Sequence, residues 1–429
     1  MGKYNVLVLG SGGREHAISW KISQSRLLNR LYIAPGNAGT GLLGKNRDLN
    51  LLDFARIKSF VLENSVDMVI VGPEEPLVKG IHDFFLADEA LKTIKVIGPQ
   101  KAGAALEGSK AFAKEFMKRH GIPTASYGSF TAERIGEAIL FLKSLKPPFV
   151  IKADGLAAGK GVVICSTVDM AVNELEDMLI NKKFGNASEK VVIEEFLSGI
   201  ELSAFAITDG NTFVMLPEAK DYKKIGEGDC GPNTGGMGSV SPVPFADEGF
   251  NKKVMERVIK PTVDGLRKEG ILYSGFLFAG LMNVNGEPYV IEYNVRLGDP
   301  ETEAILPRIT SDLLEALIAL SEGNLSGVTI DTDERTAACV MLVSGGYPGN
   351  YGKGYPVVLP LDDTASLVFH AGTRKDDKSG EVLTSGGRVI AVSSLGETLD
   401  QALDFSYNTA KKIHFRDSYY RKDIGFDLR

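Results

Sequence analysis

The sequence predicts an α/β protein with a parallel sheet at its N-terminus, a central α+β region and a small C-terminal α+β domain. Strands and helices alternate through the first 100 residues, short strands with helices begin near residue 122, and the last hundred residues are strand-rich. A chain of 429 residues is too long for one ordinary core. We therefore expect domains at 1–103, 104–328 and 329–429, with a subdomain at about 122–192.

The first domain alternates apolar strands with helical patterns. Strands are expected at 5–9, 30–34, 67–71 and 95–97, and helices at 15–24, 54–64 and 79–87. Strands separated in this way form a parallel sheet with helices on both faces, and ligands bind at the carboxyl ends of its strands. Small-residue loops mark that edge at 10–13, 34–37 and 72–76.

The remaining elements follow the same patterns. A helix is expected at 110–120 before a break at 121–123. Further strands are expected at 149–153, 161–165, 191–195, 201–208, 275–283 and 288–294, and further helices at 251–268 and 312–322. An Asn-Val-Asn-Gly turn joins the last two of these strands. The C-terminal domain should contain strands at 337–343, 357–359 and 389–392 and a helix at 399–413.

Composition excludes several classes of protein. Hydrophobic residues make up 44% of the chain and charged residues 24%, as in a soluble globular protein. The net charge of −7 and the dispersed lysines and arginines argue against a nucleic-acid partner. No signal peptide or membrane-spanning run is evident, and Cys165, Cys230 and Cys339 show no paired spacing. A cytoplasmic protein, or one of an organelle matrix after processing, is expected, with reduced thiols and no membrane partner.

The segment 291–301, Ile-Glu-Tyr-Asn-Val-Arg-Leu-Gly-Asp-Pro-Glu, is the most informative in the chain. In a strand, Glu292, Asn294 and Arg296 would point one way and the apolar residues between them toward a core. A carboxylate and an amide oxygen suit a hard cation such as Mg²⁺. A guanidinium beside them can hold a carboxylate or phosphate. The segment predicts a metal nucleotide next to an acidic substrate.

A glycine-rich turn separates Lys152 from Lys160. The sequence is not a P-loop, because the spacing from Gly155 to Gly159 is one residue short and Gly161 stands where Ser or Thr would bind Mg²⁺. It also lies between two strands. We expect a hairpin loop that closes over phosphates; a plain glycine-rich hairpin is the alternative.

Two further segments suit a nucleotide and a covering loop. At 191–203 an apolar strand ends in two acids and turns back, which suits an adenine edge, with Glu201 at the ribose; solvated acids at a strand end are the alternative. Six glycines among the thirteen residues 226–238 cost much conformational entropy on ordering, so a substrate-covering role is expected.

The loop 10–13 follows a strand and opens a helix, as a dinucleotide fingerprint does. Glu15 occupies the place of the last glycine, however. A single phosphate at a helix N-terminus needs only the first glycines. We therefore favour a phosphate-bearing substrate over the dinucleotide of a dehydrogenase.

Taken together, these segments resemble the ATP-grasp superfamily and, within it, the glycinamide ribonucleotide synthetase family of purine biosynthesis. The matching segments are 10–16, 34–39, 72–78, 106–110, 152–161, 194–197, 231–238, 292–301, 369–373, 384–388 and 421–425. The resemblance implies a pre-ATP-grasp N-terminal domain, an ATP-grasp domain whose mobile lid is the subdomain at about 122–192, and a small C-terminal domain.

The resemblance also implies residue roles. ATP would be bound by Lys110, Lys152, Lys160, Glu194, Glu195, Phe196, Leu197 and Glu201. Glu292 and Asn294 would hold Mg²⁺ or Mn²⁺. Phosphoribosylamine would be held by Gly10, Ser11, Gly12, Gly13, Asn37 and Glu75, with Asp221 at its sugar or amine. Glycine would be held by Arg296, Gly298, Asp299 and Pro300. Arg296, Lys160 and Asp221 would take part in catalysis.

The implied reaction joins glycine to 5-phosphoribosylamine through glycyl phosphate and yields glycinamide ribonucleotide, ADP and phosphate. The implied partners are small molecules, and a monomer is expected. Two features depart from the family pattern: strand 275–282 offers no acid for a second metal, and Cys230 stands where Thr is expected. Another ATP-grasp carboxylate–amine ligase or carboxylase and a non-catalytic nucleotide-binding regulator are the remaining alternatives.

Overall fold

The computed structural model describes residues 2–157, 161–360 and 365–429. Its N-terminal part is a five-stranded parallel sheet in the order β3-β2-β1-β4-β5. The strands are β1 Tyr4–Gly10, β2 Leu28–Pro35, β3 Lys45–Asn46, β4 Met68–Val71 and β5 Lys95–Ile97. Alternate residues of β1 enter two different apolar cores, Leu7 and Leu9 one and Val6 and Val8 the other. The expected parallel sheet, buried on both faces, is confirmed.

Six helices connect or cover these strands. They are α1 Gly13–Ser23, α2 Thr40–Leu43, α3 Phe54–Glu63, α4 Glu74–Val78, α5 Ile81–Ala87 and α6 Lys101–Gly108. The helix expected at 79–87 begins only at Ile81, because Gly80 adopts a left-handed conformation with φ +86° and separates α4 from α5. Helix α4 was not predicted from the sequence, and its first turn carries Glu74, which pairs with Arg296.

A second, antiparallel sheet in the order β6-β9-β7-β8 forms a small α+β unit with its own apolar core. Its elements are β6 Tyr127–Thr131, α8 Ile135–Ser144, β7 Phe149–Ala153, β8 Val162–Cys165, α9 Val168–Leu179 and β9 Lys190–Glu195. This unit lies within the region expected for the lid. A separate core is what a subdomain that moves as one body requires.

The largest sheet has eight antiparallel strands in the order β16-β15-β10-β11-β14-β17-β21-β18. Its strands are β10 Ile200–Thr208, β11 Phe213–Asp221, β14 Gly238–Ser241, β15 Gly275–Val284, β16 Glu287–Asn294, β17 Thr336–Val343, β18 Leu367–His370 and β21 Arg388–Gly396. The sheet therefore continues from the central region into the C-terminal strands, across the expected boundary at 328/329.

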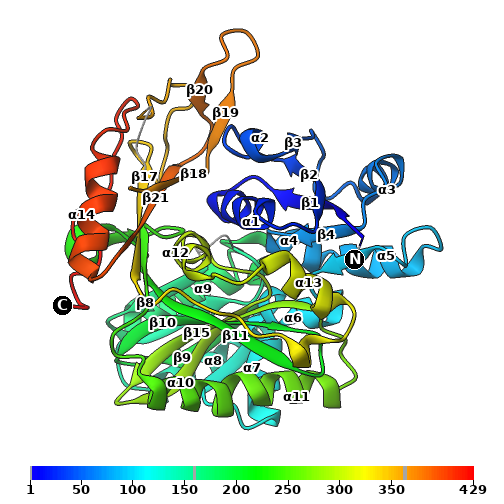
Figure 1. Cartoon of the computed structure of the whole chain (residues 1–429). Helices are drawn as coiled ribbons and strands as arrows, with labels where there is room; N and C mark the ends of the chain where they lie inside the picture. The colour runs from blue at the N-terminus through cyan, green and yellow to red at the C-terminus, as the bar shows by residue number, and fades with distance from the viewer. Residues whose placement is uncertain (1, 158–160, 361–364) are drawn as a thin grey trace.

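The remaining helices pack around this sheet. They are α7 Lys110–Arg119, α10 Glu248–Val254, a π-helical turn Met255–Ile259, α11 Lys260–Lys268, α12 Glu301–Arg308, α13 Leu313–Ser321 and α14 Leu399–Ala410. Helix α12 packs on α1 and shares an apolar core with it and with β17. In Figure 1 it lies where the N-terminal sheet, the large sheet and the C-terminal strands meet.

The strand expected at 357–359 is wrong. Only single bridges pair Pro356 with Leu383 and Val358 with His414, because Pro356 and Pro360 flank the segment and prolines lack the N–H that a continuous ladder requires. Two-stranded ribbons occur instead at β19 Thr373–Lys375 with β20 Val382–Thr384, and at β12 Lys224–Gly226 with β13 Cys230–Asn233.

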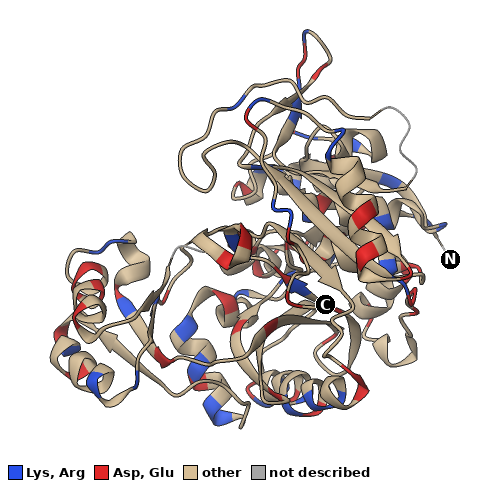
Figure 2. Ribbon diagram, turned by 90° about the vertical axis from the view of Figure 1, so that its left-hand side faces the viewer, with Lys and Arg blue, Asp and Glu red and all other residues tan. Residues whose placement is uncertain are grey.

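Acidic and basic residues are scattered over the ribbon in the view of Figure 2, with uncharged stretches between them. Within the described residues, no helix combines the length and apolar character needed to cross a membrane.

Candidate active site

The loop after β1 is shaped by Glu15. The Glu15 carboxylate accepts from the Gly12 N–H at 2.6 Å and from Arg14 Nε at 2.7 Å. A Cβ at Gly10 or Gly72 would lie within 2.5 Å of Glu15, so the side chain fills the space between the ends of β1 and β4. Glu15 thus caps helix α1 from inside the loop. This placement explains why a glycine is not needed at this position for the loop to form.

A cavity of about 410 Å³ opens beside this loop. Ser11 and Gly12 line it from the loop after β1, and Asp299 lines it from the turn before α12. The other lining residues come from the end of β2 and from three C-terminal segments: Pro35, Gly36, Tyr347, Ala371, Gly372, Thr373, Arg374, Ser385, Gly386 and Arg388. Hydroxyls, loop amides and two arginines around one cavity suit a phosphorylated sugar. The structure brings the predicted loop to this cavity but places Gly10 and Gly13 behind its wall.

Asn37 supports the cavity rather than lining it. Its Nδ2 donates to the carbonyls of Ser11 at 2.9 Å and His370 at 2.7 Å, and its Oδ1 accepts from the amides of Gly39 and Thr40. The side chain is buried, and its amide has no capacity left for a ligand. In this structure Asn37 holds the loops in place, and its direct contact with a substrate stays a prediction.

Arg296 lies beyond the end of strand β16, in a bend that follows Asn294. Its guanidinium forms ion pairs with Glu107 at 2.8 Å and with Glu74 at 3.4 Å. Burial raises the pKa of Glu107 to about 7, although the charge of Arg296 acts in the opposite direction. Glu75, the predicted substrate contact, is exposed, and its neighbour Glu74 is the acid that faces the site. Two adjacent acids in one helical turn point in different directions, so the sequence alone did not distinguish them.

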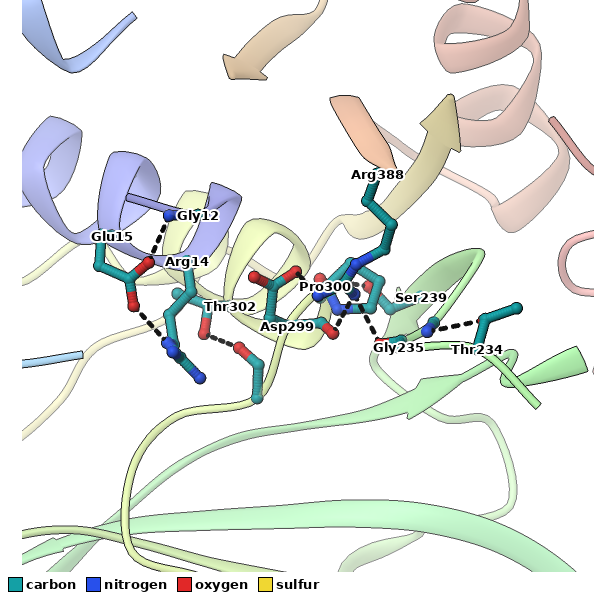
Figure 3. Close-up of polar contacts among 12 residues, drawn as sticks. Gly12, Arg14, Glu15, Thr234, Gly235, Ser239, Asp299, Pro300, Thr302 and Arg388 are labelled. Carbon is teal, nitrogen blue, oxygen red and sulfur yellow. Dashed lines mark hydrogen bonds and ion pairs between the residues drawn. The ribbon is translucent and has the colours of Figure 1, made fainter. Parts of the chain in front are cut away.

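The turn 298–300 is held from two sides. Arg388 of β21 pairs with the Asp299 carboxylate at 3.0 Å and donates to the carbonyls of Asp299 and Gly235, both at 2.5 Å. The Ser239 hydroxyl donates to the Pro300 carbonyl at 2.7 Å. Figure 3 shows Arg388 reaching down between the Asp299 turn and the glycine-rich segment at Gly235. One side chain thus joins three segments that are distant in sequence.

A cluster of lysines (Lys110, Lys114 and Lys152) lies beside strand β16. Lys152 of β7 pairs with Glu194 of β9 at 2.9 Å and donates to the Ile291 carbonyl at 3.0 Å. Lys114 of α7 pairs with the other oxygen of Glu194 at 2.8 Å. Burial opposes ionisation of Glu194, but the two lysines prevail and lower its pKa. Burial lowers the pKa of Lys110, whose Nζ donates to the Gly155 carbonyl at 3.1 Å.

The four residues predicted to contact adenine, 194–197, lie in different environments. The Glu194 carboxylate is taken up by the lysines, and the Glu195 carboxylate accepts from the Ser126 N–H at 2.8 Å. Phe196 is exposed and Leu197 is half-buried just beyond the end of β9. Any adenine contact in this segment would thus fall to its backbone and to these two apolar side chains. Lys160 lies outside the described residues.

Asp221 and Glu201 face one another across Lys223. Lys223 Nζ lies 2.8 Å from Glu201 and 3.9 Å from Asp221. Lys223 lowers the pKa of Glu201, whereas burial raises the pKa of Asp221. Burial also raises the pKa of Glu301, near Asp221, to about 7. This cluster holds acids of different proton affinity side by side, which acid–base chemistry requires.

Glu292 and Asn294 provide oxygen ligands for a cation. Neither side chain makes a hydrogen bond or ion pair with any described residue, although Lys110 and Lys223 are close enough to feel the Glu292 charge. Strand β15 presents Gly280 opposite Glu292, and a Cβ there would lie 3.1 Å from the Glu292 Cγ. Free oxygens beside a glycine fit a hard cation. No cluster of three or more His, Cys, Asp or Glu suited to a metal occurs in the described part of the chain, so phosphates or water would complete the shell.

Several site residues escaped the sequence analysis. Glu74, Glu107, Lys223 and Arg388 all contact predicted site residues, and Arg14 donates to the Leu297 carbonyl at 3.1 Å. The signal that could have found Arg388 was its place in a segment, 384–388, that had been matched but given no role. Arg14 and Glu74 are charged and are adjacent in sequence to the predicted residues Gly13 and Glu75, so they could have been proposed on the same ground.

Comparison with known proteins gives a consistent result. Family models of phosphoribosylglycinamide synthetase match in three parts: the N domain over residues 4–107, the ATP-grasp (A) domain over 108–302 and the C domain over 337–427. The chain is 46% identical over 426 residues to a phosphoribosylamine–glycine ligase of Escherichia coli strain K12 and 45% over 427 residues to one of Yersinia pestis. Each alignment covers 98% of both chains.

Solved structures agree with this result. A phosphoribosylamine–glycine ligase from Thermotoga maritima superposes with a TM-score of 0.84 at 39% identity, covering 98% of this chain and 99% of that one. An ADP complex of N5-carboxyaminoimidazole ribonucleotide synthetase gives a TM-score of 0.66 at 16% identity, covering 96% and 97%, and shares the fold alone.

Proposed function

The chain belongs to the phosphoribosylglycinamide synthetase family, and from that premise we propose that it is a phosphoribosylamine–glycine ligase of de novo purine biosynthesis. It joins glycine to 5-phosphoribosylamine at the expense of ATP and releases glycinamide ribonucleotide, ADP and phosphate. It acts as a cytoplasmic monomer on small molecules, with the domain boundaries expected from the sequence.

The observation that carries the assignment of roles is the position of residues 291–300. At one end the Ile291 carbonyl accepts from Lys152 of the lysine cluster, and at the other Asp299 lines the 410 Å³ cavity. Arg296 stands between them. A nucleotide bound by the lysine cluster and a phosphorylated amine in the cavity would therefore meet at this segment. A carboxylate held by Arg296 would lie between the two.

The first step is phosphoryl transfer. Lys110 and Lys152, with Lys160, hold the ATP phosphates, and Arg296 holds the glycine carboxylate, whose oxygen attacks the γ-phosphorus as ADP leaves. Glu292 and Asn294 would hold Mg²⁺ or Mn²⁺, which spreads the charge of the phosphates when bound. The ion pairs of Arg296 with Glu74 and Glu107 orient its fork toward the reacting carboxylate.

The second step is acyl transfer. The nitrogen of phosphoribosylamine attacks the acyl carbon of glycyl phosphate, the bond to the phosphate oxygen breaks, and phosphate leaves. Asp221 takes the proton lost by the nitrogen, because burial raises its pKa and makes it a stronger base than an exposed aspartate. Glycyl phosphate reacts with water, so the lid and the glycine-rich segment exclude solvent.

The test uses purified protein, ATP and Mg²⁺, with product identified by mass spectrometry. ADP and phosphate should appear in equal amounts with glycinamide ribonucleotide, and only when glycine and phosphoribosylamine are both present. Turnover with bicarbonate in place of glycine would support a carboxylase instead. Binding of ATP without turnover of any carboxylate would point to a regulator.

A further inference from the structure

The C-terminal tail, residues 421–429, contacts the glycine-rich hairpin formed by residues 224–233. Arg421 Nη1 donates to the Asp229 carboxylate at 2.7 Å and to the Lys224 carbonyl at 3.1 Å. The Gly228 N–H donates to the Asp423 carboxylate at 2.7 Å. The contacts span 192 positions between Asp229 and Arg421 and 195 positions between Gly228 and Asp423. None of these residues is among the predicted substrate contacts.

Arg421 is itself held rigidly. Its side chain is fully buried, and Nε and Nη2 both donate to Asp423 at 2.8 Å in a bidentate pair. The guanidinium lies over the rings of Tyr222 and Phe426, with centroids 5.4 and 5.8 Å away. A fully buried guanidinium is costly unless each N–H finds a partner. The fold therefore commits several residues to fixing this one side chain.

The hairpin has little packing of its own. All residues of β13 are exposed, and Gly228, Asp229 and Gly231 adopt positive φ angles between +52° and +81°. Such a segment loses much conformational entropy on ordering. Ile225 packs against an apolar core, and the polar contacts of the turn, at Gly228 and Asp229, are with the tail. The tail therefore contributes to the ordering of the turn.

The hairpin begins one residue after Lys223. The Lys223 carbonyl accepts from the Thr234 N–H at 2.7 Å and the Thr234 hydroxyl at 2.8 Å, and the next carbonyl, that of Lys224, accepts from Arg421. Lys223 in turn pairs with Glu201, the acid predicted at the ribose. We infer that Arg421 is a positioning residue: it fixes the hairpin so that Lys223 and Glu201 are set for the nucleotide.

Two experiments test this inference, and only the kinetic one rests on the proposed ligase activity. The structural experiment measures the mobility of a spin label on the hairpin. Cys230 is exposed there while Cys165 and Cys339 are buried, so a nitroxide maleimide should attach selectively to Cys230. Arg421→Gln should give a markedly more mobile spin label than the parent chain. Arg421→Lys should do the same, because an ammonium cannot make the bidentate fork. Arg429→Gln, which breaks only the exposed pair of the same tail with Asp400, should leave the spectrum unchanged.

In the kinetic experiment, Arg421→Gln should raise the KM for ATP about tenfold while the KM for glycine changes less than about twofold, since Arg296 is held independently of the hairpin. Asp229→Asn keeps the pair of Arg421 with Asp423 intact and should raise the KM for ATP by a smaller factor. Adding Asp229→Asn to Arg421→Gln should add little. If Arg421→Gln does not fold, Asp229→Asn alone must still mobilise the label.

The positioning role would be overturned if the label in these variants were as immobile as in the parent chain. Equal increases in the KM for ATP and for glycine would also overturn it. Absence of ligase activity in the parent chain would refute the proposed function and leave the label result to decide the hairpin contact.

Discussion

Replacement of Glu194 by glutamine tests the charge balance of the lysine cluster. The carboxylate lies between Lys114 at 2.8 Å and Lys152 at 2.9 Å, and all three side chains are at most 4% exposed. Removing one partner from a buried ion pair costs about 3–5 kcal/mol. Lys114 keeps its bond to Thr124 at 2.7 Å and Lys152 keeps the Ile291 carbonyl. We therefore expect the low end of that range, about 3 kcal/mol.

The loss of unfolding free energy caused by Glu194→Gln should become smaller both at high and at low pH. The pKa of Lys114 is already lowered to about 8, from 10.5, and would fall further without Glu194. A lysine with a depressed folded-state pKa leaves the unfolded chain holding more protons, so stability recovers as pH rises toward 10. The pKa of Glu194 is lowered from 4.5, so its stabilising contribution in the parent chain is present above pH 4.5 and is lost below it. The penalty should thus be largest near pH 7.

The assay is equilibrium urea unfolding followed by circular dichroism between pH 4 and 10. Glu195→Gln is the matched control, because the next residue accepts only the Ser126 N–H and should cost no more than about 1 kcal/mol. If Glu194→Gln is no less stable than this control, or if its penalty is constant across the range, the charge argument is wrong.

Three further variants test the site. Arg296→Ala should raise the KM for glycine about 10–100-fold and leave that for ATP nearly unchanged, in steady-state assays; equal effects on both would contradict its role. The raised pKa of Glu107, about 7 against 4.5, means that its contribution to stability is full below pH 4.5 and is lost as pH rises through about 7. Glu107→Gln should remove that part of the pH dependence in melting curves taken from pH 4 to 8. Glu292→Gln should raise the Mg²⁺ concentration for half-maximal turnover by at least about tenfold, and an unchanged Mg²⁺ titration would exclude it as a ligand.

Local sequence patterns predicted the elements and failed where the backbone departs from regular geometry. Alternation along 288–294 placed Glu292 and Asn294 on one side, and neither side chain has a hydrogen-bond or ion-pair partner among the described residues. The pairing of β15 with β16 shifts register between Gly280 and Leu281, which makes Ile291 an extra residue, and the strand ends before Arg296. A bulge and a strand end are set by the partner strand, so alternation along one strand cannot reveal them.

Contacts between residues that are far apart in sequence could not be predicted, for a different reason. The bond from Arg388 to Gly235 spans 153 positions and that from Arg421 to Asp229 spans 192. Nothing in a local window indicates which arginine of the C-terminal part will find which acid or carbonyl. The matched segments at 384–388 and 421–425 marked both places, but only the fold shows what each arginine touches.

These two arginines act on one segment. Arg388 holds Gly235 after the hairpin, and Arg421 holds Lys224 and Asp229 within it. A segment with so many glycines is expensive to order, and two buried or half-buried guanidinium groups from the C-terminal part supply the contacts that order it. The eight-stranded sheet makes this arrangement rigid, because β17 pairs directly with β14, the strand that carries Ser239. Strand β14 pairs in turn with β11, which carries Asp221, and β21 pairs with β17. The C-terminal strands therefore belong to the construction of the site, and their loosening should impair nucleotide use before it unfolds the chain.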